Sequence, residues 1–232
     1  MIKERLNILN KIDELSKDIS KTELILDETS KILALEINPN QKETILMTAG
    51  CHGNEPAPVY AMGKFLEEKN FPKDKRIILI PCINPIGFVS DSEFTPEKIN
   101  VNRDFKENSN SKEANFLRKI VKKYNPEFVV NLHEDPDETD FYIWVEDNAY
   151  KSKAEKLIAE LNVSYFKDKD IHGNQVKDGI ILDSKEHDSF EDYLIKNHIP
   201  TFCTETPGEW SIEKRIKVNL DILNKIVNEV SK

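Results

Sequence analysis

The sequence is poor in glycine and cysteine and contains no long apolar stretch. Its 232 residues include 7 glycines and 3 cysteines. No apolar run approaches the roughly 20 residues that a helix needs to cross a membrane, so we expect no membrane partner. The cysteines, Cys51, Cys82 and Cys203, are odd in number and widely spaced. A disulfide framework is therefore not expected, and a reducing, cytoplasmic location fits this pattern.

Positive charge is also in short supply. Lys and Arg total 33 against 42 Asp and Glu, which gives a formal net charge of −9. Nucleic acids and anionic membrane surfaces attract basic proteins, so we expect neither as a partner. Charged residues interrupt every apolar cluster in residues 1–19, which is not the pattern of a signal peptide.

Strand-like and helix-like segments alternate along the chain. The N-terminus has an amphipathic helix pattern, with an expected apolar face formed by Ile2, Leu6, Leu9, Ile12, Leu15 and Ile19. The expected strands cover residues 31–37, 43–50, 76–85, 127–135, 141–147 and 200–208. The other expected helices cover residues 55–70, 111–126, 149–162, 189–200 and 211–232. This order predicts an α/β fold, a three-layer α/β/α sandwich around a mixed, mainly parallel sheet. No linker rich in Pro, Gly and Ser interrupts the chain, so we expect one catalytic domain over residues 1–232.

Side chains that bind metals follow three of the expected strands. His52 and Glu55 come after "ILMTAG", His133 follows "FVVNL", and Glu205 follows "TFCT". Ligands bind at the carboxyl ends of the strands in an open α/β sheet. Two His and one carboxylate are a common zinc ligand set that leaves the fourth position to water. The pattern indicates one Zn²⁺ held by His52, Glu55 and His133, with Glu205 free to take a proton from water.

Each of these segments has a simpler explanation when it is taken alone. An H-x-x-E pair in a loop is usually solvated polarity. A single His at a strand end is more often part of the hydrogen-bonded structure than a ligand. Glu205 could cap the last helix, although Ser211 is better placed to do so. The shared position at the ends of neighbouring strands is what favours a metal site.

Five short motifs make the chain resemble the zinc carboxypeptidases, including their small prokaryotic members and the related aspartoacylase and succinylglutamate desuccinylase branch. The motifs are "HGNE" at 52–55, "INPIGF" at 83–88, "NVNRDF" at 100–105, "NLHED" at 131–135 and "TETPG" at 204–208. The resemblance implies the phosphorylase/hydrolase-like fold of that family and hydrolysis of an amide bond next to a free carboxylate.

The resemblance also implies a role for individual residues. The implied zinc ligands are His52, Glu55 and His133. Glu205 corresponds to the general base and acid, and Asn102 and Arg103 to the catalytic-site pair that holds the free carboxylate of the substrate. A planar guanidinium suits a carboxylate because it can donate two parallel hydrogen bonds. The simpler alternative for Arg103 is a surface ion pair with Asp104 or Glu107.

Two residues that the family usually has are missing. Residues 89–99, "VSDSEFTPEKI", contain no arginine to polarise the scissile carbonyl, and Lys98 is the nearest cation. Residues 178–189, "DGIILDSKEHDS", contain no tyrosine, although His187 in that loop could supply a proton. The remaining histidines, His172 and His198, lie in a turn and at a helix end. The match to the metal site is therefore stronger than the match to a peptide-cleaving subtype.

Three functions remain open at this level. The first is a metallocarboxypeptidase that acts on small peptides. The second is an N-acyl-amino-acid deacylase of the aspartoacylase/succinylglutamate desuccinylase kind. The third is a zinc-binding module without catalysis, an alternative prompted by the missing arginine. The sequence gives no indication of the oligomeric state.

Overall fold

The computed structural model describes residues 2–145, 148–167, 175–182 and 187–230. Its centre is an eight-stranded sheet with the strand order β1-β2-β4-β3-β5-β8-β6-β7. The strands are β1 (Ser20–Ile25), β2 (Lys31–Ile37), β3 (Thr44–Ala49), β4 (Arg76–Ile80), β5 (Phe128–Asp135), β6 (Tyr142–Val145), β7 (Ile180–Ile181) and β8 (Thr201–Pro207). The α-helices are α1 (Ile2–Leu15), α2 (Pro56–Glu68), α3 (Pro85–Ser90), α4 (Lys112–Tyr124), α5 (Lys151–Leu161), α6 (Phe190–Lys196) and α7 (Ile212–Lys225). No helix among these residues is long and apolar enough to cross a membrane.

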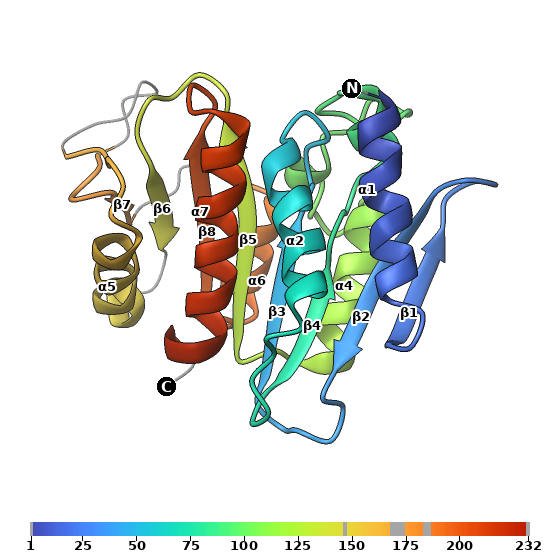
Figure 1. Cartoon of the computed structure of the whole chain (residues 1–232), viewed down its shortest axis with the longest axis horizontal. Helices are drawn as coiled ribbons and strands as arrows, with labels where there is room; N and C mark the ends of the chain where they lie inside the picture. The colour runs from blue at the N-terminus through green and yellow to red at the C-terminus, as the bar shows by residue number, and fades with distance from the viewer. Residues whose placement is uncertain (1, 146–147, 168–174, 183–186, 231–232) are drawn as a thin grey trace.

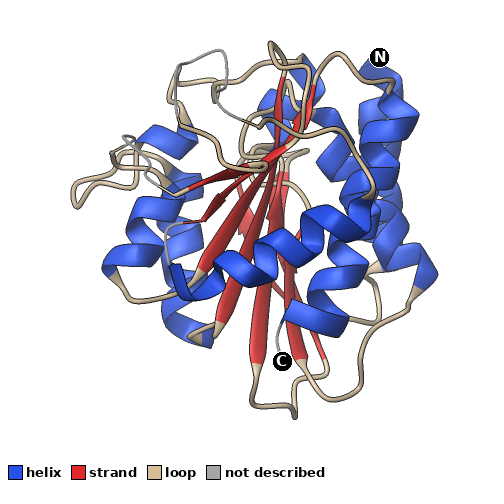
Figure 2. Ribbon diagram, turned by 90° about the vertical axis from the view of Figure 1, so that its left-hand side faces the viewer, coloured by secondary structure: helices blue, strands red, loops and turns tan. Residues whose placement is uncertain are grey.

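The sheet is mixed, with a parallel centre. Strands β4, β3, β5 and β8 run parallel to one another. Antiparallel pairs lie toward the edges, where β2 joins β4 and β6 joins β8. Figure 1 shows α1, α2 and α7 in front of the sheet and α4 and α6 behind it, and Figure 2 shows the two helix layers from the side. The expected three-layer α/β/α fold is confirmed.

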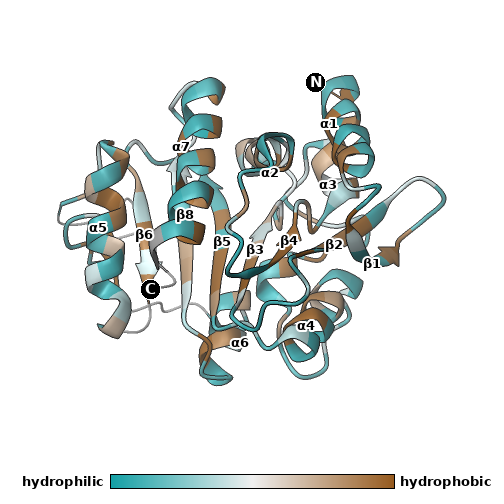
Figure 3. Ribbon diagram, turned by 60° about the horizontal axis from the view of Figure 1, so that its bottom comes forward, coloured by the Kyte–Doolittle hydropathy of each residue, from teal (hydrophilic) through white to brown (hydrophobic). Residues whose placement is uncertain are grey.

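Two apolar cores fill the spaces between the layers. One core packs β-strand side chains against α1, α2, α5 and α7, and the other packs them against α4 and α6. Figure 3 shows apolar colours on the central strands and mixed colours on the helices around them. Alternate residues of β5 enter opposite cores, with Val130 and Leu132 on the α2 side and Val129 on the α4 side. The same alternation sends His133 and Glu134 to opposite faces of the sheet.

Several predictions about elements were wrong in detail. The strand expected over residues 76–85 ends at Ile80, and α3 begins at Pro85. Prolines at 81 and 85 explain this end because proline cannot donate to a strand ladder. The edge strand β1 was not predicted, since its "SKTELI" sequence exposes most of its side chains and carries little apolar signal.

The first helix also departs from its expected apolar face. Ile2 and Leu6 are 62% and 44% exposed, and Ile19 lies beyond the helix end. Arg5 is buried instead. Its guanidinium donates to the carbonyl oxygens of Gly53, at 2.8 Å, and Phe88, at 2.6 Å, and to Asp91 Oδ1, at 2.7 Å. A single charged side chain thus joins α1 to α3 and to the loop that contains His52 and Glu55.

Replacing Arg5 with Met should lower the free energy of unfolding by about 2–3 kcal/mol, because two buried carbonyl groups lose their donors. Urea unfolding would measure this loss. Lys11→Met is the matched control on the same helix, since it breaks only the exposed ion pair with Glu67. The control should cost less than about 1 kcal/mol. Equal losses in the two variants would contradict the prediction.

Candidate metal centre

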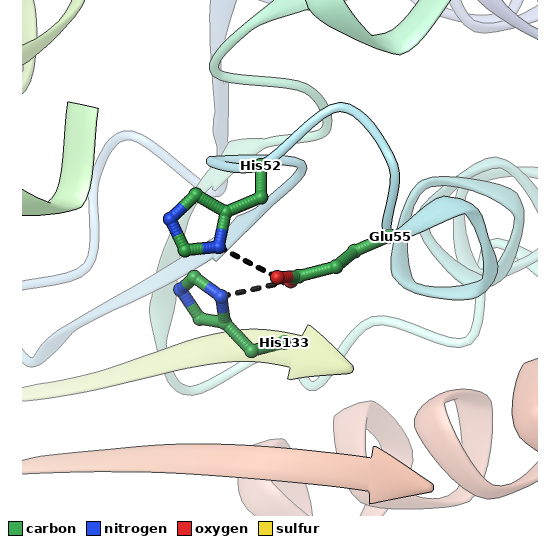
Figure 4. Close-up of side chains that lie close together, drawn as sticks. All are labelled: His52, Glu55 and His133. Atoms are coloured by element: carbon green, nitrogen blue, oxygen red, sulfur yellow. Dashed lines mark hydrogen bonds and ion pairs between the residues drawn. The ribbon is translucent and has the colours of Figure 1, made fainter. Parts of the chain in front are cut away.

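Three side chains predicted as zinc ligands converge at one point (Figure 4). His52 Nδ1 lies 2.6 Å from Glu55 Oε1, and His133 Nδ1 lies 2.8 Å from Glu55 Oε2. One candidate ligand atom from each residue lies within 4.8 Å of the other two. Glu55 and His133 are buried, and His52 is partly exposed. Side chains from separate segments therefore meet at one candidate metal site, and their role as zinc ligands stays a prediction.

The loop between β3 and α2 presents two of these side chains. Gly50 follows the last residue of β3 and has φ +66°, a conformation that favours glycine. Gly53 packs directly on α3, where an added Cβ would lie 2.0 Å from the carbonyl carbon of Gly87. Pro56 then starts α2, as its fixed φ allows. Glu55 precedes the helix without capping it, so its carboxylate is free to face the two imidazoles.

Strong electrostatic coupling marks this cluster. Burial alone would raise the pKa of Glu55, but the neighbouring imidazoles of His133 and His52 lower it to about 2. Burial would likewise lower the pKa of His52, but the Glu55 carboxylate raises it to about 9. The carboxylate is thus held in its charged form, which is the form that binds a metal. A divalent cation could replace the protons that join these groups.

Both histidines have a partner for the second ring nitrogen. His52 Nε2 lies 3.0 Å from Asn100 Oδ1, and His133 Nε2 lies 2.9 Å from Asn131 Nδ2. The Asn100 oxygen can accept the Nε2–H of His52, which is the kind of partner that a metal-binding histidine usually has, whereas the amide nitrogen of Asn131 donates to His133 Nε2 and fixes that ring from the donor side. With both Nδ1 atoms directed at one carboxylate, the residues fit a zinc ion.

Glu205 occupies the neighbouring strand at the level of the cluster. It pairs with His133 in the parallel β5–β8 ladder, so both side chains leave the same face of the sheet. On its other side Glu205 pairs with Tyr142 of β6. The Tyr142 hydroxyl donates to Asp135 Oδ2 at 2.7 Å. Burial, together with the charges of Glu205 and Asp135, raises the pKa of Tyr142 well above its usual range.

Asn102 and Arg103 lie in a short 3₁₀ turn, Val101–Arg103. Asn102 is buried, and its Oδ1 accepts from the backbone N–H of Phe190 at 2.9 Å. Arg103 is exposed and donates to the Asn102 carbonyl oxygen at 2.9 Å. Asp104, the acidic residue next to it, forms an ion pair with Lys106. The role of Asn102 and Arg103 in binding a carboxylate stays a prediction.

The other predicted polar residues do not join the cluster. Lys98 is exposed in a turn, and His187 and His198 are exposed. His172 lies outside the described residues. Glu134, next to His133, faces the opposite core, where Arg215 binds its Oε1 at 2.7 Å. Burial raises the pKa of Glu134 to about 7, although Arg215 opposes this rise.

The sequence interpretation missed four side chains around the cluster: Asn100, Asn131, Tyr142 and Glu191. Asn131 precedes His133 by two positions in "NLHED", and the two-residue period of a strand could have placed both on one face. No comparable signal joins Glu191 to the site, since it lies 60 residues from Asn131.

Comparisons with known structures agree on the fold. A proposed metallopeptidase from Shewanella amazonensis superposes with a TM-score of 0.82 at 23% identity, covering 99% of this chain and 93% of that one. A metallo-carboxypeptidase from Burkholderia cenocepacia gives 0.72 at 11% identity, covering 94% and 66%. A succinylglutamate desuccinylase from Silicibacter gives 0.67 at 15% identity, covering 90% and 64%. No curated protein matches the sequence.

The α/β/α sandwich places the chain in the class of zinc-carboxypeptidase-like folds. Residues 41–167 match the model of the succinylglutamate desuccinylase/aspartoacylase catalytic domain, and this match covers more than half of the chain. The chain belongs to that family. The matched segment includes the His52 loop and His133, whereas α1, Glu191 and Glu205 lie outside it.

Proposed function

We propose that the protein is a zinc-dependent hydrolase of the metallocarboxypeptidase type, which cleaves an amide bond beside a free carboxylate. The observation that carries this proposal is the convergence of two imidazole Nδ1 atoms on the Glu55 carboxylate. Glu205, in register with His133, adds a second carboxylate on the same face of the sheet. Family membership supports amide hydrolysis as the reaction class.

In the proposed reaction His52, Glu55 and His133 hold one zinc ion. The bound metal supplies Lewis-acid activation, which lowers the pKa of a water molecule to about 7. Glu205 takes the proton of the attacking water and passes it to the departing nitrogen. The carbonyl carbon gains the water oxygen and loses the amine, so the products are a carboxylate and a free amine. Asn102 and Arg103 orient the substrate through its existing carboxylate.

Carboxylate-bearing compounds recur among the structural relatives. A Pseudomonas aeruginosa metallo-carboxypeptidase was solved with (2-guanidinoethylmercapto)succinic acid, and the Silicibacter relative is a succinylglutamate desuccinylase. These relatives support a small peptide with a free carboxyl end as the substrate class. The family match makes N-acyl amino acids the second candidate. The cysteines are free and buried, which supports the proposed location in a reducing cytoplasm.

A matched pair of blocked peptides tests the proposal, one ending in a carboxylate and one in an amide. The zinc-loaded protein should cleave the free acid with a kcat/KM about 10–100-fold higher, because a hydrogen bond to a charged group contributes about 1.5–3 kcal/mol. Arg103→Met should remove most of this preference. An N-acyl amino acid assayed in parallel separates the two substrate classes.

A chelator provides the control for metal dependence. Hydrolysis should stop when zinc is removed and return when it is added back. If the zinc-loaded protein cleaves neither peptides nor N-acyl amino acids, the protein is a binding module and the proposal is wrong. Equal rates for the acid and the amide would reject the assigned role of Arg103.

A further inference from the structure

A buried carboxylate lies behind the candidate metal centre and has no part in the proposed reaction. Glu191 stands in the first turn of α6 and is 6% exposed. Its Oε1 accepts from Asn131 Nδ2 at 2.6 Å, and its Oε2 accepts from Asn102 Nδ2 at 3.2 Å. Burying a carboxylate is costly unless hydrogen bonds or opposite charge compensate it. Two hydrogen bonds from neutral amides offset only part of the cost of burying this carboxylate, which suggests that Glu191 has a functional role.

The first amide leads to a predicted zinc ligand. Asn131 Nδ2 lies 2.9 Å from His133 Nε2 as well as donating to Glu191. Thr48 Oγ1 donates to Asn131 Oδ1 at 2.8 Å and so fixes the amide from its other side. A ring nitrogen of His133 and a carboxylate oxygen of Glu191 lie within 4.8 Å of each other. Glu191 therefore brings a negative charge close to the ring that would hold the metal.

The second amide leads to the predicted substrate-binding pair. Asn102 uses one side of its amide for Glu191 and the other for the backbone N–H of Phe190. Phe190 and Glu191 are consecutive residues of α6. The start of this helix thus holds the Asn102 side chain between two contacts. One carboxylate lies between the metal ligand His133 and the residue expected to bind the substrate.

A related arrangement stands behind the other histidine. His52 Nε2 contacts Asn100 Oδ1, and Asn100 Nδ2 donates to Glu93 Oε1 at 2.6 Å. Each predicted ligand histidine therefore contacts an asparagine, and that asparagine donates a hydrogen bond to a glutamate. Glu93 is partly exposed, whereas Glu191 is buried, so the charge of Glu191 is less screened by water.

We propose that Glu191 is a positioning residue that orients His133 for the metal, through Asn131, and holds Asn102 for the substrate. This inference rests on the proposed function. The groups that fix the ring of a metal-binding histidine matter for the metal, and their loss typically weakens metal binding about 10–100-fold. The carboxylate also accepts from both amides at once, which a glutamine at this position cannot do.

Glu191→Gln tests the proposal, with Glu113→Gln as its matched control. Both glutamates follow a serine N-cap by two residues, and both are buried, at 6% and 4% exposure. Glu113 accepts a hydrogen bond from its own cap, Ser111, at 2.9 Å. Competition with a chromogenic chelator would give the Zn²⁺ dissociation constant of each protein. We expect an increase of about 10–100-fold for Glu191→Gln and no change for Glu113→Gln. KM for the free-acid peptide should also rise in Glu191→Gln alone.

The outcomes separate this inference from the proposed function. Failure of the wild-type protein to bind Zn²⁺ would reject the proposed function. Normal Zn²⁺ binding by the wild type and by Glu191→Gln would reject the positioning role alone. His133, Glu191 and Cys203 also have candidate ligand atoms within 4.8 Å of one another. Binding of two ions per chain, with the second lost in Cys203→Ser, would therefore also reject the positioning role, since Glu191 would then be a ligand. If Glu191→Gln does not fold, Glu191→Asp serves as the second variant. It keeps the charge but moves the carboxylate oxygens away from the two amides, so weaker Zn²⁺ binding is expected again. If neither variant folds while Glu113→Gln does, Glu191 serves the fold and the proposal is wrong.

Discussion

Glu205→Gln should lower kcat by about 10²–10⁴-fold, the usual contribution of a general acid–base residue. Glutamine keeps the shape of the side chain but cannot accept the proton of the attacking water. Steady-state kinetics on the free-acid peptide would measure the effect. Glu205 stands on the neighbouring strand, and the proposed ligands are His52, Glu55 and His133, so Zn²⁺ affinity should stay within a few-fold of the wild type.

The combination of lost turnover and retained metal distinguishes a proton-transfer role from a ligand role. Loss of Zn²⁺ in Glu205→Gln would make Glu205 a ligand. Normal turnover in this variant would show that another group moves the proton. Tyr142→Phe is a useful companion, since Tyr142 pairs with Glu205 in the β6–β8 ladder. If the only role of Tyr142 is its hydrogen bond to Asp135, Tyr142→Phe should lower the free energy of unfolding and leave kcat nearly unchanged.

The residues that sequence analysis placed correctly are those whose position follows from local pattern. Apolar runs bounded by polar residues identified the central strands, and the rule that ligands lie at their carboxyl ends brought His52 and His133 together. Parallel pairing of β3 with β5 then confirmed the expected neighbourhood. The edge strand β1 escaped because a half-exposed strand carries few apolar residues.

The contacts that sequence analysis could not place are those between distant polar side chains. Glu191 reaches Asn131 across 60 positions and Asn102 across 89, and Arg5 reaches Phe88 across 83. No periodicity predicts such pairs, since they depend on how whole helices dock on the sheet. A buried Arg in the first helix even contradicts the apolar face that its spacing indicated.

Residues 89–99, which lack the arginine usual in the family, contribute a carboxylate near the candidate metal centre instead. Glu93, in this segment, accepts a hydrogen bond from Asn100, which in turn contacts His52. The segment thus supports a predicted metal ligand through a carboxylate. Lys98, the nearest cation in that segment, is exposed. Polarisation of the scissile carbonyl would then fall chiefly to the metal in the proposed reaction.

His52→Ala should raise the Zn²⁺ dissociation constant by at least about 100-fold, the upper end of the loss caused by removing an outer partner, because a direct ligand is lost. His52 is a suitable choice since it is only partly buried, so the metal-free fold should tolerate the change. Exposed His187 supplies the control, and His187→Ala should bind Zn²⁺ like the wild type. The same control tests whether His187 donates a proton, which would lower kcat without changing metal affinity.

Unfolding with and without metal gives a second measurement of the same effect. A ligand that binds only the folded state stabilises it by about 2.7 kcal/mol when present at 100 times its dissociation constant. At that concentration of Zn²⁺, the wild type and His187→Ala should gain this stability, and His52→Ala should gain less than about 0.5 kcal/mol. An equal gain in His52→Ala would place the ion elsewhere, because the ring whose Nδ1 faces Glu55 would then contribute nothing to holding it.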